Sequence, residues 1–369
     1  MSSLVTTKFK RNASRILPFG LIWLGTSWVF LLSDMTLSRN QNLNPDTDIT
    51  LTIPVIIFAS IMVVIVGLLV GTIEMIVLEK HFRNYKLIEK IAYKLLFYLL
   101  FMLLLISFTY PVAASIEQNT SITNKEVWLK MGRFLGSLTF LNTMIQLAFS
   151  LLLSLVYSAI SENLGHNVLR NIFFGKYHNP KIERRIFMFL DMKNSTTIAE
   201  EMGHVEYFKL LRAYYEIMSD PIINSKGEVY QYIGDEVVVT WNEEAGFYRN
   251  NCINCFHEIK NNLNNQSEFF LNEFGVIPDF KAGIHVGEVT TGEIGALKKE
   301  IVFTGDVLNT TSRIQSLCKD HQSDLIISDT LLSGLKISNE IKISELGEFS
   351  LKGKSHPMTL HAVEFQLSG

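Results

Sequence analysis

Two acidic side chains follow β-type segments in the C-terminal half of the chain. Asp191 comes directly after the apolar run 186–190, and Asp235 lies in a Gly-Asp turn between two β-rich stretches. Carboxylates displayed at adjacent strand ends can hold two Mg²⁺ ions, which activate an attacking oxygen and neutralise a leaving pyrophosphate. Either acid alone would be interpreted as a strand end facing water, so the hypothesis depends on what accompanies the pair.

Two further sets of polar residues strengthen the hypothesis. The segment after Asp191 joins a strand to a helix, so backbone N–H groups at the helix start can receive phosphates. These are the N–H groups of Asn194, Ser195 and Thr196. Asn309 and Arg313 are four residues apart on a predicted helix and therefore lie on one face. An amide and a fixed cation there can bind a ribose and a transition state with developing charge.

Alternating strand and helix patterns from residue 184 onward must position these residues. The patterns predict strands at 184–191 and 279–289, two β-rich stretches within 228–241, and a strand–helix unit at 301–318. A further helix is predicted at 197–218, and its apolar face is formed by Ile198, Met202, Phe208 and Leu211. This mixture predicts one sheet covered by helices.

The ordered set of motifs resembles the catalytic domain of class III adenylyl and guanylyl cyclases. Five segments match that family in order and spacing over about 182–363, which is far beyond a chance match. They are Phe189–Thr196, Ile233–Asp235, Ala282–Glu288, Thr304–Arg313 and Leu351–Lys354. The resemblance implies an α+β, ferredoxin-like βαββαβ domain that converts ATP into 3′,5′-cyclic AMP and pyrophosphate for intracellular signalling.

The resemblance also implies a role for each site residue. Asp191, Asp235 and the backbone carbonyl of Met192 are implied to bind two Mg²⁺ or Mn²⁺ ions. Asn309 is implied to hold the ribose, and Arg313 to stabilise the α-phosphate. In the family the metal acids and the Asn/Arg pair of one site come from different domains, so a single domain per chain implies a homodimer with two sites.

Phosphate and base recognition are less well defined by the motifs. Lys352, in preference to Lys354, is implied to contact the terminal phosphates. Gln231 and Val302 occupy the positions where family adenylyl cyclases carry Lys and Asp or Thr, and guanylyl cyclases carry Glu and Cys. Gln can both donate and accept, whereas Val makes no hydrogen bond. We predict ATP from the prevalence of adenylyl cyclases; another base, giving cyclic GMP or a cyclic pyrimidine nucleotide, is the alternative.

The first 160 residues contain long apolar runs with few charges. Four of them can cross a bilayer, at about 16–33, 51–72, 95–114 and 134–160. Lys and Arg gather in the N-terminal tail, between the second and third runs and after the fourth, which predicts that both termini are cytoplasmic at the cell's inner membrane. We therefore predict a transmembrane domain at 1–160, a helical connector at 161–183 and a catalytic domain at 184–366.

Several remaining features are assigned structural roles. Cys252 and Cys255 are predicted to be buried helix positions rather than a metal site, and His285 to pack between strands. Glu74, near the inner end of the second span, is expected to reach towards the interface. The motif Gly67-x-x-x-Gly71 supports a helix contact between two chains. A net charge of −3 gives no indication of a nucleic-acid partner.

Three other functions compete with the cyclase interpretation. A diguanylate cyclase would need a second glycine at Ile233 and an aromatic residue at Val237, and it has no place for the Asn309/Arg313 pair. A silent nucleotide-binding membrane sensor would usually have lost a metal acid or the arginine, and all are present. A transporter or channel would show polar positions inside the spans and would leave the C-terminal motifs unexplained.

Overall fold

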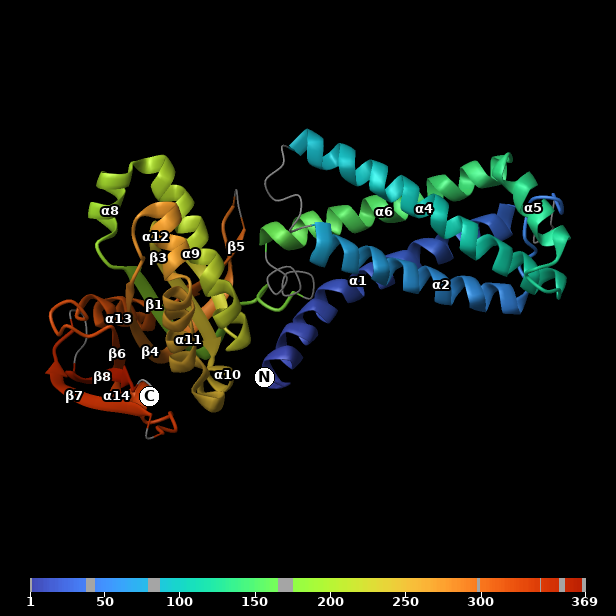
Figure 1. The fold of residues 1–369 in the computed structure, drawn as a ribbon. Coiled ribbons are helices and arrows are strands. Elements are labelled where there is room, and N and C mark those ends of the chain that lie inside the picture. Colours follow the sequence, from blue (N-terminus) through green and yellow to red (C-terminus); the bar gives the residue numbers. More distant parts are fainter. Residues whose placement is uncertain are drawn as a thin grey trace. The chain divides into compact units, whose positions relative to one another are not determined.

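The computed structural model describes residues 2–37, 44–78, 87–164, 175–296, 299–338, 340–351 and 356–366. The chain divides into two compact units, one formed by residues 9–170 and the other by residues 171–369 together with residues 1–8 (Figure 1). We call the first the helical unit and the second the sheet unit, and each is described by itself.

The helical unit is built from long apolar helices. Its main elements are α1 (Ser2–Leu37), α2 (Ile53–Thr72) with the π-helix η1 (Ile73–Leu78), α4 (Leu87–Gln118) and α6 (Leu138–Leu164). Among the described residues, four stretches are long and apolar enough to cross a membrane: Asn12–Thr36, Ile53–Leu78, Ala92–Gln118 and Leu138–Ser161. The structure therefore confirms the four predicted helical runs.

A short helix that the sequence analysis did not predict lies before the fourth span. This helix, α5 (Lys125–Leu135), begins where the side chain of Asn124 accepts a hydrogen bond from the Glu126 N–H at 3.1 Å. Its amphipathic spacing buries Val127 and Phe134 against the rest of the unit. Phe134 thus belongs to α5, and the fourth span begins four residues later than predicted.

The prediction that Glu74 reaches the membrane interface is wrong. Its side chain lies inside the helical unit, where the residue is only 4% exposed. The Lys94 ammonium group donates to one carboxylate oxygen, and the Tyr98 hydroxyl donates to the other at 2.8 Å. Glu74 also lies in the π-helical turn η1. Lys94, assigned from the sequence to a loop, therefore belongs to the third span and forms a buried ion pair.

The two glycines of the Gly67-x-x-x-Gly71 motif are used inside the unit. A Cβ atom at Gly67 would lie 2.8 Å from the Phe19 carbonyl oxygen, and one at Gly71 would lie 2.8 Å from the Phe19 ring. Hydrogen at these positions lets α2 approach α1 closely. The motif accordingly forms a contact within the chain, not the predicted contact between chains.

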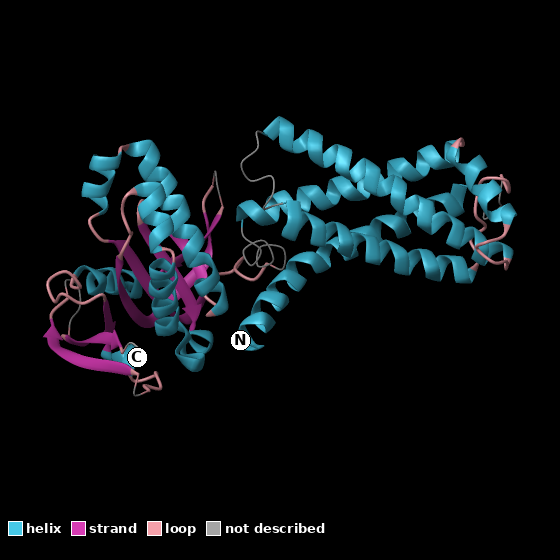
Figure 2. Cartoon of the chain, viewed as in Figure 1, coloured by secondary structure: helices cyan, strands magenta, loops and turns pink. Residues whose placement is uncertain are grey.

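The sheet unit contains one eight-stranded sheet among its described residues (Figure 2). Its strands are β1 (Lys181–Met192), β2 (Glu228–Ile233), β3 (Glu236–Asn242), β4 (Phe280–Ile294), β5 (Glu300–Thr304), β6 (Leu325–Ser328), β7 (Ile341–Phe349) and β8 (Met358–Phe365). Its longer helices are α8 (Ser195–Met202), α9 (His204–Asn224), α11 (Asn251–Asn265), α12 (Ser267–Phe274) and α13 (Asp306–Ser316). The neighbours β2-β3-β1-β4 pair antiparallel. With α9 and α11 as connections, this is the predicted ferredoxin-like βαββαβ arrangement.

Both faces of β1 are covered, which explains its unbroken apolar run. Ile186, Met188 and Leu190 face one way and join a core with residues of α9 and α11. Phe187 and Phe189 face the other way and pack near α13. Successive side chains of a strand point to opposite faces. Asp191 therefore lies on the α13 side of the sheet.

The predicted helix over 197–218 is in fact two helices. Gly203 separates α8 from α9 with a backbone φ of +82°, a conformation that suits glycine. Phe208 and Leu211 both lie on α9, but only Leu211 belongs to its buried face, and Phe208 is 70% exposed. The single apolar face predicted from four residues is therefore wrong at Phe208.

The first strand of the sheet begins earlier than predicted. The first strand starts at Lys181, inside the range 161–183 that was assigned to the connector. At the other end of that range, α6 ends at Leu164, and residues 165–174 lie outside the described part of the chain. Cys252 and Cys255 are fully buried on α11, as predicted.

Candidate active site

The two candidate metal acids lie at one end of the sheet. In the β1–β3 ladder Leu190 is paired with Val237, so Asp191 follows this pair on one strand and Asp235 precedes it in the β2–β3 turn. Gly234, with φ of +65°, makes that tight turn possible. The carboxylates also affect each other. Burial first, and then the charge of Asp235, raise the pKa of Asp191 against the opposing effect of Lys281.

The polar partners of the two acids are unequal. Asp191 Oδ2 lies 3.3 Å from Lys281 Nζ and accepts a hydrogen bond from Gln315 Nε2 at 3.2 Å. Asp235 Oδ2 is buried, and it has no hydrogen-bond partner among the described residues. An orphaned buried carboxylate oxygen next to a second acid fits a cation as its missing partner.

The donor set suits Mg²⁺ bound together with a substrate. The described residues contain no group of three or more His, Cys, Asp or Glu side chains placed to hold an ion. Mg²⁺ usually takes one or two carboxylates and completes its octahedron with waters and substrate phosphates. The side chain of Met192 is buried in the core, which leaves only its backbone for the predicted contact with a metal.

A charge network that sequence reasoning missed supports the loop after Asp191. The Lys193 ammonium group contacts the carboxylates of Asp279, at 2.7 Å, and Asp324. Lys260 contacts the same two carboxylates, at 2.8 Å for Asp324. Burial alone would lower the pKa of Lys193, but the two carboxylates raise it overall. Only the topology of β1, β4 and β6 brings these residues together, so no local sequence signal could have revealed them.

The candidate phosphate-binding segment has the predicted strand–turn–helix form. Asn194 adopts φ of +56° and turns the chain from β1 into α8, which begins at Ser195. Its side chain makes no capping hydrogen bond with the helix. The N–H groups of the first turn of a helix have no acceptor within the helix. Those of Ser195 and Thr196 belong to that turn. Lys352 and Lys354, the candidates for the terminal phosphates, lie outside the described residues.

The helix that carries the Asn/Arg pair packs against the sheet through its other face. A Cβ atom at Gly283 of β4 would lie 2.4 Å from the backbone nitrogen of Gln315, so glycine is what allows α13 to approach this closely. Val307, Thr310, Thr311, Ile314 and Gln315 form the buried face of α13. Asn309 is exposed, and Arg313 is half-buried. The Nη1 atom of Arg313 is nevertheless buried, without a hydrogen-bond partner among the described residues.

The structure brings some of the predicted residues together and keeps others apart. Asp191 and Asp235 are adjacent, and Gln315 extends from the buried face of α13 to Asp191. Asn309 lies on the opposite side of that helix, away from the acids of its own chain. Such a separation is expected if the pair acts on a substrate held by a second copy.

The candidate base-recognition residues lie on neighbouring segments of one chain. The Tyr230 hydroxyl accepts a hydrogen bond from the Phe303 N–H at 3.4 Å, and the centres of these two rings are 4.9 Å apart. This contact joins β2, which carries Gln231, to β5, which carries Val302. Gln231 is exposed and Val302 is half-buried, so both are available on the surface. His285, by contrast, is buried and hydrogen-bonded to Ser328 Oγ at 2.7 Å.

Comparisons with known proteins find nucleotide cyclases. The adenylate cyclase 2 of Rhizobium meliloti (strain 1021) is 30% identical over 201 residues, which cover 54% of this chain and 55% of that protein. The human retinal guanylyl cyclase 2 is 29% identical over 174 residues, covering 45% of this chain and 15% of that protein. A bacterial light-regulated adenylyl cyclase structure superposes with a TM-score of 0.51 at 22% identity, covering 60% of this chain and 65% of that chain.

The chain spans about half the length of the first of these relatives and a smaller share of the second. The match to the family described as the adenylate and guanylate cyclase catalytic domain extends over residues 178–364, just over half of the 369 residues. These residues include all of the described sheet except Phe365 at the end of β8, and both candidate metal acids. The chain therefore belongs to the adenylate and guanylate cyclase catalytic domain family.

Proposed function

We propose that this protein is a membrane-anchored nucleotidyl cyclase that converts ATP into 3′,5′-cyclic AMP and pyrophosphate at sites shared between two copies. The observation that carries the proposal is the orphaned buried oxygen of Asp235 beside Asp191. In the reaction the ribose 3′-hydroxyl loses its proton to water and its oxygen forms a bond to the α-phosphorus, and the bond from that phosphorus to the oxygen bridging to the β-phosphate breaks. Pyrophosphate leaves with that oxygen and its electron pair.

The residues that would bind the substrate and the metal ions lie on two surfaces of this chain. Asp191, Asp235 and the Met192 carbonyl would hold the metal ions. Two Mg²⁺ or Mn²⁺ ions, when bound, supply charge neutralisation at the attacking oxygen and at the leaving pyrophosphate. The first-turn N–H groups of α8, with Lys352, would bind the phosphates.

From the partner copy, Asn309 would orient the ribose, and the Arg313 guanidinium group would donate to the α-phosphate as negative charge builds up. The unpartnered Arg313 Nη1 supports this role, because a buried guanidinium nitrogen needs an acceptor. The position of Asn309 supports the dimer, since it is exposed on α13 and is not part of the face that packs against its own sheet.

A mixed dimer tests the shared site. Asp191→Ala and Arg313→Ala should each be inactive alone, because both sites of each homodimer lack one component. Co-expression gives a mixed dimer with one intact site and one site carrying both defects. With random pairing, about a quarter of wild-type activity should return. If mixed dimers form in a pull-down but no activity returns, the site lies within one chain.

The nucleobase is the second question, and one observation keeps guanine and the pyrimidines as candidates. Gln231 and Val302 lie on adjacent segments, and neither forms the Lys–Asp or Glu–Cys pair of the family patterns. A Gln amide can hydrogen-bond to any base. Incubating the purified full chain with ATP, GTP, CTP and UTP in turn, with Mg²⁺ or Mn²⁺, and identifying each cyclic product decides among them. A preference for any nucleotide other than ATP would contradict the adenylate cyclase assignment while leaving the family intact.

The proposed arrangement is a transmembrane domain at 1–160, a connector that ends where β1 begins at Lys181, and a catalytic domain that extends from there to residue 366, with both termini in the cytoplasm. The distribution of Lys and Arg supports this orientation. A reporter fused to either terminus should be active in the cytoplasm, and one inserted at Asn44 should be active outside. A cytoplasmic reporter at Asn44 would contradict the four-span topology.

A further inference from the structure

The helical unit contains a half-open cavity that the cyclase reaction does not use. Its volume is about 290 Å³, and its walls come from α1, α2, α4, α5 and α6 together with the loop after α1. An apolar cavity of about 150 Å³ can bind benzene. This cavity therefore has room for a molecule of roughly twice that size.

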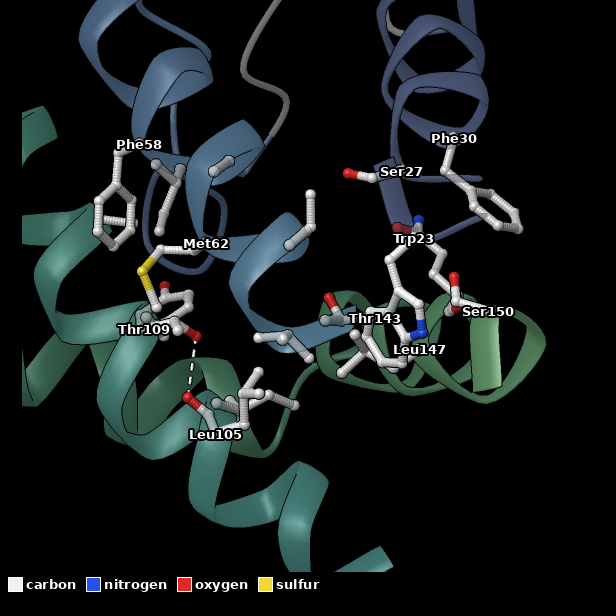
Figure 3. A pocket seen from close by; sticks show the side chains of 18 of the residues that line it. Trp23, Ser27, Phe30, Phe58, Met62, Leu105, Thr109, Thr143, Leu147 and Ser150 are labelled. Carbon is white, nitrogen blue, oxygen red and sulfur yellow. Dashed lines mark hydrogen bonds between the residues drawn. The ribbon is translucent and has the colours of Figure 1, made fainter. Parts of the chain in front are cut away.

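The walls of the cavity differ in chemistry. Figure 3 shows Phe58 and Met62 of α2 on one side and Ser27 of α1 with Thr143 and Ser150 of α6 on the other. Gln146 also lines the cavity, one helical turn from Ser150 on α6. None of the described lining residues is charged. The cavity is thus mainly apolar, and on the α1/α6 side it also carries neutral hydrogen-bonding groups.

Most polar side chains that line the cavity already have partners. The hydroxyls of Thr109 and Thr143 donate to backbone carbonyl groups of their own helices at 3.0 and 2.8 Å. Ser150 donates to the Gln146 carbonyl at 3.0 Å, and Tyr110 donates to the Thr47 carbonyl at 2.6 Å. Trp23 Nε1, at the inner end, donates to Ser154 Oγ at 3.0 Å.

Two lining groups stand out from this pattern. Neither the Ser27 hydroxyl nor the Gln146 side-chain amide has a hydrogen-bond partner within the described part of the chain. Both lie on the α1/α6 wall, where Thr26 and Ser150 are hydrogen-bonded across the two helices at 2.7 Å. Ser27 and Gln146 are both half-buried, so their polar groups are accessible from the cavity that they line. They are therefore available to hydrogen-bond with a molecule held there.

We propose that this cavity is a binding site for a neutral lipophilic ring compound that carries a hydroxyl or carbonyl oxygen. The ring system would pack against Phe58, Met62 and their aliphatic neighbours. The oxygen would hydrogen-bond with Gln146 and Ser27, which can each donate and accept. A carboxylate or an ammonium group is excluded as the head group because no opposite charge lines the described walls. This site is independent of the cyclase reaction proposed above.

The probe pair 2-naphthol and naphthalene tests the proposal, because the two share a ring system and differ by one hydroxyl. Binding is measured by equilibrium dialysis against the full chain in lipid nanodiscs, with protein-free nanodiscs correcting for partition into lipid. The wild-type protein should show one saturable site per chain for 2-naphthol. No saturable binding above the lipid background would overturn the proposal.

Three variants locate the site. Gln146→Leu should weaken 2-naphthol binding about tenfold, the loss expected for one or two hydrogen bonds, and leave naphthalene binding unchanged. Ala113→Leu fills part of the cavity and should abolish binding of both probes. Asn142→Leu, one turn from Gln146 but exposed and outside the cavity, should change neither.

Unchanged cyclic nucleotide formation in each variant shows that the chain is folded. Saturable binding that survives Ala113→Leu would place the site elsewhere. An equal loss of both probes in Gln146→Leu would contradict the hydrogen-bonding wall.

Discussion

Buried charged groups in the helical unit have partners, whereas two at the candidate active site have buried atoms without one among the described residues. In the helical unit Glu74 has both Lys94 and Tyr98 as partners, and the Lys130 ammonium group lies 2.5 Å from a Glu117 oxygen. At the candidate active site, buried atoms of Asp235 and Arg313 have no hydrogen-bond partner among the described residues. Because folded chains satisfy buried charges wherever they can, the exceptions indicate where a ligand completes the structure.

The sheet unit itself provides an internal control for this comparison. Arg185 is buried at the start of β1, and its guanidinium group has three partners: Thr240 Oγ1 at 3.0 Å, Glu228 at 3.3 Å and Glu183 at 3.4 Å. The same unit therefore satisfies a buried cation fully, about six residues along the strand from Asp191. The unpartnered buried atoms of Asp235 and Arg313 are therefore a property of the candidate active site and not of the sheet unit as a whole.

The strongest test of the comparison is removal of an acid at the site. Asp191→Ala or Asp235→Ala should reduce cyclic nucleotide formation by at least about a hundredfold, because the metal ions lose a ligand. The fold should survive, since Asp235 Oδ2 gives up no hydrogen bond within the described chain. Product formation is measured by chromatography of the purified protein, with Glu201→Ala on the exposed surface of α8 as the matched control. Activity near the wild-type level in either variant contradicts the metal assignment.

The opposite behaviour is expected for the paired charge of the helical unit. Glu74→Leu leaves the Lys94 ammonium group buried without its counter-charge, which should cost about 3–5 kcal/mol of stability. The double variant Glu74→Leu/Lys94→Leu removes both charges and should recover most of that loss. Thermal unfolding of the protein in nanodiscs measures both. If the double variant is no more stable than the single one, the pair does not act as a unit.

The smallest expected effect is on the pH dependence of stability when the site holds no metal. The pKa of Asp191 in the folded chain lies above its unfolded value, so the folded state binds more protons in the interval between the two values. Stability should therefore decrease as pH rises through that interval, and the penalty is complete above the folded pKa.

Asp191→Asn removes this charge. The variant should unfold at a higher temperature than wild type at neutral pH in EDTA, and the difference should vanish below the unfolded pKa, at about pH 3. A stability difference that is independent of pH would show that the raised pKa of Asp191 is not its cause. A lower unfolding temperature of Asp191→Asn at neutral pH would show that the charge of Asp191 stabilises the folded chain. Asp191 would then resemble Glu74 in this respect and not differ from it.

The sequence was sufficient for the parts of the site that depend on local pattern. Asp191 and Asp235 follow β-type runs, and the four-residue spacing of Asn309 and Arg313 places both on one face of α13. Contacts that depend on strand register could not be predicted. Lys281 reaches Asp191 because the two residues are directly opposite in the β1–β4 ladder. Gln315 reaches it because Gly283 allows the helix to approach.

The errors in the helical unit have a similar origin. Glu74 and Lys94 each lie close to the end of an apolar run, where a charge normally turns towards water. Their pairing requires α2 and α4 to be neighbours, which no single segment reveals. In the sheet unit, Phe208 was misplaced because it lies on α9 outside the face that Leu211 helps to bury.

The buried pair also has a consequence for biosynthesis. Glu74 and Lys94 are separated by 20 residues along the chain. At about 5–20 residues per second, Glu74 is synthesised roughly one to four seconds before the lysine that neutralises it. If the helical unit is inserted into a bilayer during translation, the second span must hold an uncompensated carboxylate until the third span arrives. The two spans would therefore enter the lipid as a hairpin, and a chain that stalls between them would be a substrate for quality control.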